Sequence, residues 1–158
     1  MEFLIKLFHY NRWANNRILK ILQELPDPPA KALELFVHIS SGMDIWLDRL
    51  EGKVVKAADS FPNLSLPECR NLEERVYQRM ENFLKKVTVH QLKSTIRYKN
   101  LKGVEYENGL EDILYHLINH STYHRGQINK ELRQQGKNPA AVDYILYVRE
   151  GQGITRTG

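Results

Sequence analysis

Apolar side chains recur every three or four residues along the first 25 positions of the chain, without a break. The members of this row are Leu4, Leu7, Asn11, Ala14, Ile18, Ile21 and Leu25. The spacing puts one row of side chains on one face of a helix, which is typical of a helix in a bundle. Asn11 is its only polar member, so we expect it to be hydrogen-bonded inside the fold. The run Pro26-Asp-Pro-Pro29 ends the helix, because proline lacks an amide donor.

Three further segments predict long helices. Residues 30–51 are apolar on nearly all sides, and Ser40, Ser41 and Gly42 form a waist of small residues where a neighbouring helix could come close. Residues 66–88 carry Pro67 in the first turn. Their predicted inward side chains are Cys69, Leu72, Val76, Phe83 and Val87. The last long helix begins near Asn108, which forms a capping-box pattern with Glu111, and stops near Gly136.

The remaining segments predict connections and short elements. Residues 53–66 read as a loop, with turn residues Ser60, Pro62, Asn63 and Ser65. Between residues 92 and 107 the apolar period drops to two, which predicts a hairpin of 95–98 and 104–106 around Lys102-Gly103. The tail through Val142 and Val148 predicts a short fifth helix, followed by a frayed end from Gly151 to Gly158. We therefore expect an all-α four-helix bundle, with a β-hairpin insertion and a short C-terminal helix, as one domain over residues 1–158.

Composition narrows the class of protein. Apolar residues make up 42% of the 158 residues and charged residues 27%, as in soluble globular proteins. The lone Cys69 excludes an intramolecular disulfide framework and suits a reducing cytoplasm, with core packing as its expected role. We find no signal-peptide pattern and no apolar run approaching the roughly 20 residues that span a bilayer, so we expect a cytoplasmic protein without a membrane partner. The net charge of +4 is spread along the chain, and the densest basic stretch, 93–102, reads as a solvated hairpin face, which disfavours nucleic acid as a partner.

His120 and His124 lie four residues apart on the last long helix, so both imidazoles can reach one point in space. By helical periodicity they lie roughly 85° and 30–45° from the middle of the apolar face, whereas His116 lies roughly 125° away. These angles favour the pair and disfavour His116 as a metal ligand. The spacing matches the outer positions of the zinc-protease motif His-Glu-x-x-His, but Ser121 stands where the Glu would act as general base. We therefore expect a metal site without that protease chemistry.

A third ligand must come from another helix, and three histidines remain. His90 stands among lysines, where a cation would be repelled, and His9 lies off the apolar row of the first helix. His38 is embedded in the most apolar helix. An isolated buried histidine is usually a hydrogen-bonded core residue. Because His38 is expected to lie opposite a His pair, however, we favour it as the third metal ligand. A three-histidine set leaves coordination positions open, which is the pattern of catalytic sites.

Three motifs resemble a known family, the DinB-like proteins, named after a DNA-damage-inducible bacterial protein. They are Tyr10-Asn-Arg-Trp-Ala-Asn15, His38, and Asn119-His-Ser-Thr-Tyr-His-Arg-Gly-Gln127, and the resemblance covers essentially the whole chain. It implies an up-down-down-up four-helix bundle that is commonly dimeric. It also implies a divalent zinc or nickel site that maps onto His38, His120 and His124, which includes the pair that the helical angles favour.

The resemblance also implies a chemistry, because some relatives use the metal to activate a low-molecular-weight thiol. The expected function is a metal-dependent thiol S-transferase or isomerase that acts on a small electrophile through a metal-bound thiolate. The alternatives are a non-enzymatic metal-binding stress-response protein and, third, a nucleic-acid-binding protein. An apolar cleft that opens onto the metal would favour the enzyme. A closed metal site would favour a structural role, and a continuous basic face would favour nucleic-acid binding.

No catalytic residue beyond the ligands can be assigned from the sequence. Polar residues near the ligands are expected to hold them in place: Asn119, Tyr123, Arg125 and Gln127, and likewise Asp44 and Asp48. Tyr10, Trp13 and Arg17 form a second stripe on the first helix, which suggests a homodimer interface. Packing of this stripe against the C-terminal segment explains it equally well.

Overall fold

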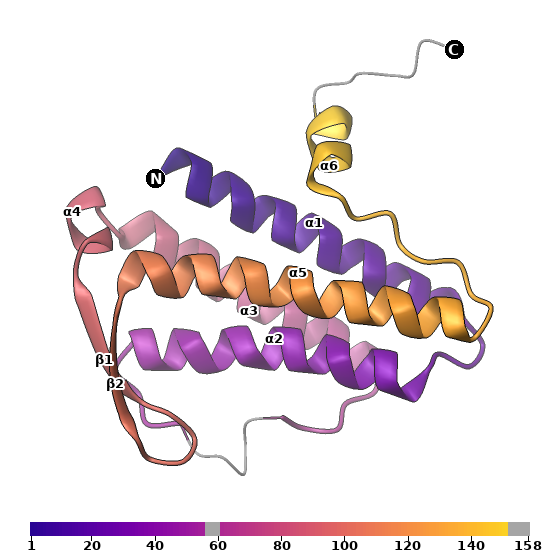
Figure 1. Cartoon of the computed structure of the whole chain (residues 1–158), viewed down its shortest axis with the longest axis horizontal. Helices are drawn as coiled ribbons and strands as arrows, with labels where there is room; N and C mark the ends of the chain where they lie inside the picture. The colour runs from indigo at the N-terminus through magenta and orange to yellow at the C-terminus, as the bar shows by residue number, and fades with distance from the viewer. Residues whose placement is uncertain (56–60, 152–158) are drawn as a thin grey trace.

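Four long helices form the body of the protein in a computed structural model, which describes residues 1–55 and 61–151. They are α1 (Glu2–Glu24), α2 (Ala30–Leu50), α3 (Leu66–Lys86) and α5 (Leu110–Gln134). Figure 1 shows α1 and α5 running in one direction and α2 and α3 in the other. The predicted four-helix bundle and its up-down-down-up order are thereby confirmed. In the described ranges, no helix is both long enough and apolar enough to cross a membrane.

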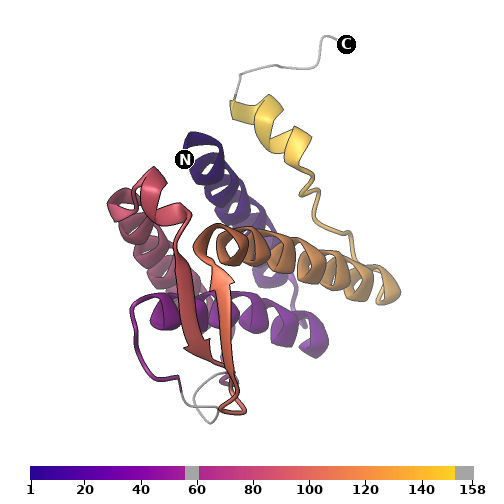
Figure 2. The same cartoon turned by 60° about the vertical axis from the view of Figure 1, so that its left-hand side comes forward.

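The smaller elements lie outside the four long helices: a hairpin at one end of them, and a short C-terminal helix against the middle of α1. A single turn, α4 (Val89–Leu92), leads into strand β1 (Thr95–Lys99), which pairs antiparallel with β2 (Glu105–Gly109). This hairpin runs down past the end of α2 in Figure 2, and the Tyr98 ring packs edge-on against Trp46 of α2, with 4.7 Å between ring centres. The short helix α6 (Tyr144–Gly151) follows α5. The hairpin and the short helix are confirmed, whereas Ser60 and the frayed tail beyond Gly151 lie outside the described residues.

The predicted capping box of the last long helix is wrong. Asn108 belongs to β2, where its side-chain oxygen accepts a hydrogen bond from the Tyr98 hydroxyl at 2.7 Å. The strand pairing continues to Gly109 opposite Thr95, so the helix begins only at Leu110 with Gly109 as its N-cap. The sequence pattern placed the helix start inside the ladder because it took no account of where the hairpin pairing ends.

Two apolar clusters fill the bundle, one at each end. The cluster near the hairpin contains buried residues such as Leu4, Met80, Leu84 and Leu114. The other cluster contains Ile18, Phe36, Cys69 and Leu132. Cys69 has no exposed surface and burial raises its pKa to about 11, so the predicted packing role is confirmed. On α3, Met80 and Leu84 are buried whereas the predicted Phe83 and Val87 are only partly buried, since the helix presents the neighbouring stripe to the core.

The aromatic stripe on α1 is covered by the chain itself. The Tyr10 ring packs edge-on against Tyr144 of α6, with 5.2 Å between ring centres. The side chains of Trp13 and Arg17 both donate hydrogen bonds to the carboxylate of Glu150, at 2.9 and 2.7 Å. This confirms packing against the C-terminal segment as the explanation of the stripe. The expected homodimer loses that support.

Candidate metal centre

Three histidine side chains meet between α2 and α5, which lie side by side at the front of Figure 1. The Nε2 atom of His120 lies 3.2 Å from the Nε2 of His38 and 3.2 Å from the Nε2 of His124. One ring nitrogen from each histidine lies within 4.8 Å of the other two. Three nitrogens bound to one ion at about 2.1 Å would be about 3.0–3.4 Å apart, depending on the coordination geometry. Both separations from His120 fall inside that window, and all three nitrogens lie within 4.8 Å of one another, so the three side chains could hold a divalent cation.

The small residues of α2 allow this close approach. A Cβ atom added at Gly42 would lie 3.5 Å from Cε1 of His120, which is already van der Waals contact. A larger side chain at that position would therefore press on the ring. The sequence predicted that a neighbouring helix comes close at this waist, and the neighbour is the part of α5 that carries His120.

A hydrogen bond fixes the orientation of His124. Its Nδ1 lies 2.7 Å from Oε1 of Gln127, one turn further along α5. Since the amide oxygen can only accept, Nδ1 carries the proton and Nε2 presents its lone pair toward the other two histidines. Gln127 thus holds the His124 ring in one orientation. On the other side of the site, the ring of Phe61 stacks on His38, with 4.8 Å between ring centres.

The electrostatics keep the site ready for a cation. Burial, together with the positive charges that His124, His38 and His116 would carry, lowers the pKa of His120 to about 4. Burial, together with His124, also lowers the pKa of His38. Both rings are therefore neutral at pH 7, and a neutral imidazole is the form that binds a metal.

A cleft of about 680 Å³ opens onto His38 and His124. Its wall is mostly apolar, and its apolar residues are Ala30, Leu33, Leu35, Val37, Phe61, Pro62 and Leu64. At its edge Lys31 forms an ion pair with Glu34 at 2.8 Å. This volume is within the range of sites that hold small molecules, about 300–1,000 Å³.

The other histidines lie away from this set. The ring centre of His116 is 5.4 Å from that of His120, and the ring packs edge-on against Trp46 instead. His9 of α1 lies 3.9 Å from the carboxylate of Glu81 on α3. His90 is exposed on α4. Within the described ranges, the group of side chains close enough together to hold a metal ion consists of His38, His120 and His124, and His116 is not in it.

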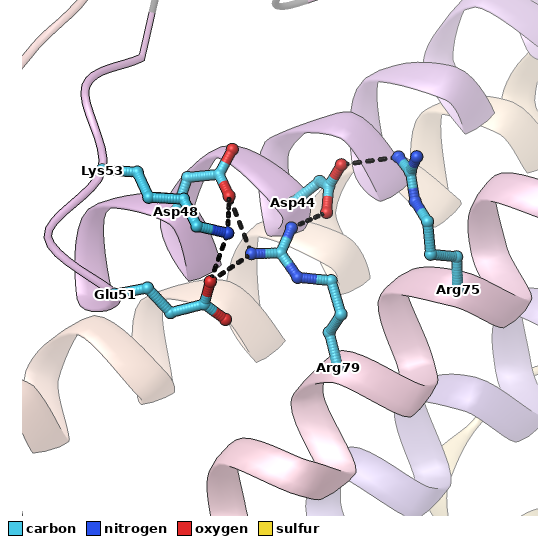
Figure 3. Close-up of polar contacts among 6 residues, drawn as sticks. All are labelled: Asp44, Asp48, Glu51, Lys53, Arg75 and Arg79. Atoms are coloured by element: carbon cyan, nitrogen blue, oxygen red, sulfur yellow. Dashed lines mark hydrogen bonds and ion pairs between the residues drawn. The ribbon is translucent and has the colours of Figure 1, made fainter.

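The expectation that Asp44 and Asp48 hold the metal ligands in place is wrong. Figure 3 shows both carboxylates turned toward α3, where Arg79 bonds to both of them. Arg75 adds a bond to Asp44 at 2.7 Å, and Lys53 pairs with Asp48 at 3.4 Å. These aspartates follow His38 in the sequence but occupy a different face of α2, so they stabilise the α2–α3 contact.

Arg125 also departs from its expected role beside the ligands. Its side chain is 1% exposed and turns into the bundle, where Nη1 donates to the side-chain oxygens of Asn11 and Asn15. The expected internal hydrogen bonding of Asn11 is thereby confirmed. Tyr123 touches the His124 ring by its edge but is 65% exposed, and Asn119 faces solvent.

Sequence reasoning missed two side chains, one that packs on the histidine site and one that is buried inside the bundle. Phe61 lies in a connecting segment without periodicity, so no signal could have placed it on His38. Buried Glu73 on α3 was also missed. Its signal was available, because a carboxylate stands on the same helical stripe as Cys69, Leu72, Val76 and Met80.

An all-helical bundle in which three histidines from two helices could hold a divalent ion defines the class of this protein. The model of the DinB family matches residues 1–155, and the chain belongs to that family. It is 29% identical to protein DinB of Bacillus subtilis (strain 168), over 93% of this chain and 94% of that one. In fold it is similar to the crystal structure of a DinB-like protein from Bacillus cereus ATCC 10987. That similarity has a TM-score of 0.70 at 20% identity and covers 90% of this chain and 97% of the other.

Proposed function

We propose that this protein is a cytoplasmic metal-dependent enzyme that uses a metal-bound thiolate of a low-molecular-weight thiol, either to transfer the thiol to a small electrophile or to isomerise that electrophile. The observation that carries the proposal is the position of the three histidines at an apolar cleft large enough for a small molecule. A structural metal site is normally closed by four protein ligands, whereas three leave positions for an exogenous ligand. The apolar cleft that opens onto His38 and His124 thus favours an enzyme over a purely structural metal site.

The donor set agrees with a zinc or nickel ion. Neutral imidazole nitrogens suit both metals, whereas magnesium and calcium prefer oxygen ligands. When bound, such an ion supplies Lewis acidity and lowers the pKa of a thiol, so that a nucleophile is available at neutral pH. The protein's own part is to hold the ion through His38, His120 and His124, to orient His124 through Gln127, and to exclude water with the apolar wall of the cleft.

Peptide hydrolysis is not part of the proposal. Ser121, which stands where a zinc protease has its general base, is 1% exposed and donates its hydroxyl hydrogen to the carbonyl of Leu117 at 2.8 Å. A buried hydroxyl that is already bonded cannot take a proton from an attacking water as a carboxylate does. A thiol needs no such base once its pKa is lowered.

The test follows thiol consumption with a model electrophile in metal-loaded protein. We expect turnover in the wild type and in His116→Ala, and loss of turnover in His124→Ala or after chelation. Added zinc or nickel should restore the chelated wild type but not the variant. Identical rates in wild type and His124→Ala would reject the metal–thiol chemistry and favour the non-enzymatic metal-binding protein.

A further inference from the structure

Six polar side chains lie buried behind the three histidines, between the two apolar clusters. They come from all four long helices, and none is more than 7% exposed: Asn11 and Asn15 of α1, Ser40 of α2, Glu73 of α3, and Ser121 and Arg125 of α5. We call these six residues the polar layer. Ser121 and Arg125 each follow a ligand histidine directly, and Ser40 follows His38 by two residues.

Hydrogen bonds join the layer into one chain across the bundle. Arg125 donates from Nη1 to Oδ1 of Asn15 at 2.8 Å and to Oδ1 of Asn11 at 2.5 Å. Asn15 in turn donates from Nδ2 to Oε1 of Glu73 at 2.9 Å, and Ser40 donates its hydroxyl to Oε2 of Glu73 at 2.6 Å. Asn15 therefore links the buried cation to the buried carboxylate, and the chain ends on α2.

Stability alone does not account for this arrangement. Burial lowers the pKa of Arg125 and raises the pKa of Glu73, so it opposes both charges. Buried ionic groups can often be replaced by well-packed apolar residues without loss of stability. Apolar contacts, however, tolerate sliding and rotation of one helix against another, whereas hydrogen bonds require particular distances and angles. A polar layer therefore fixes the register of helices more strictly than an apolar one.

The helices whose register matters here are α2 and α5, because they carry the three ligands. At about 100° per residue, Arg125 points to a different side of α5 from His124, and Ser40 lies nearly opposite His38 on α2. The layer thus bonds α5 on a side away from His124, through the asparagines of α1, and it bonds α2 on the side nearly opposite His38, through Glu73 of α3. We propose that the polar layer positions the three Nε2 atoms by fixing the register of α2 and α5, with the Ser40–Glu73 bond setting the place of His38.

This inference rests on the proposed metal site, and Co²⁺ titration of the purified protein tests both separately. Ser40→Ala removes the bond that holds α2. Glu73→Gln keeps both contacts, because the amide oxygen can accept from Asn15 while the amide nitrogen donates to the Ser40 hydroxyl, which can also accept. Leu22→Ala is the matched control, since Leu22 is fully buried on α1 in the apolar cluster away from the hairpin. The readouts are the Co²⁺ dissociation constant and the visible absorption bands of the bound ion, at a temperature where melting curves show every variant folded.

We expect Ser40→Ala to weaken Co²⁺ binding about tenfold, as is typical when a residue that orients metal ligands is lost, and to shift the absorption bands. Glu73→Gln should stay close to the wild type. Leu22→Ala should melt at a lower temperature but bind Co²⁺ with unchanged affinity and bands. Unchanged affinity and bands in Ser40→Ala would overturn the positioning role. A wild type that binds no Co²⁺ would instead overturn the proposed metal site itself.

Discussion

Gln127 provides the sharpest local test of how the site is built, because its side-chain oxygen bonds directly to one of the three proposed ligands. Its Oε1 accepts the Nδ1 proton of His124 at 2.7 Å, which keeps the Nε2 lone pair directed at the site. One such hydrogen bond contributes about 0.5–1.5 kcal/mol, and a tenfold change in affinity corresponds to about 1.4 kcal/mol. Gln127→Ala should therefore weaken zinc binding by up to about tenfold. Gln127→Glu should strengthen it, because a carboxylate makes the imidazole more basic.

The assay is competition for Zn²⁺ with a chromophoric chelator at pH 7.5. Gln134→Ala is the matched control, since this glutamine is exposed at the end of the same helix. We expect Gln127→Glu to bind most tightly, the wild type next and Gln127→Ala most weakly, with the control equal to the wild type. Wild-type affinity in Gln127→Ala, or weaker binding in Gln127→Glu, would refute the orienting role of this hydrogen bond.

Three further predictions follow from the geometry. The free energy of unfolding of the metal-free protein, measured in urea, should decrease as the pH falls from 6.5 toward 4. In that window the depressed pKa of His120 makes the unfolded chain bind more protons than the folded protein. His120→Gln should therefore flatten this pH dependence. Arg79→Ala should lower the free energy of unfolding by about 1–2 kcal/mol, since one guanidinium bonds three carboxylates on α2 and at its end, while zinc affinity stays at the wild-type value. Phe61→Ala should weaken binding of a straight-chain alkyl thiol to the metal-loaded protein by about three- to tenfold, because a half-buried aromatic ring is lost from the cleft wall. The affinities are measured by calorimetry, and equal affinities in the variant and the wild type would contradict a role of Phe61 in thiol binding.

The fold was predictable from the sequence because its signals are local. The three-and-four spacing of Leu4 to Leu25, the prolines at 26–29 and the drop to a period of two before Tyr98 each act within a few residues. The start of the last long helix was not predictable from the sequence, because it depends on the pairing of Thr95 with Gly109 across the hairpin. A pattern read along one segment contains no information about where a neighbouring strand ends.

The same distinction applies to the site. The angular positions of His120 and His124 follow from periodicity, and the choice of His38 followed from elimination and the family resemblance. By contrast, the direction in which Asp44 and Asp48 point depends on the arginines of α3, and the stacking of Phe61 depends on a connecting segment. The homodimer, the native metal and the extent of the domain stay predictions.

The most direct test of the metal site is elemental analysis of the purified protein combined with X-ray absorption at the bound metal. We predict one zinc or nickel ion per chain, with three imidazole nitrogens at about 2.0–2.1 Å. His116→Ala should retain the ion, and His38→Ala and His120→Ala should each lose it. Stoichiometric metal in His120→Ala, or equal loss in His116→Ala, would contradict a centre formed by His38, His120 and His124.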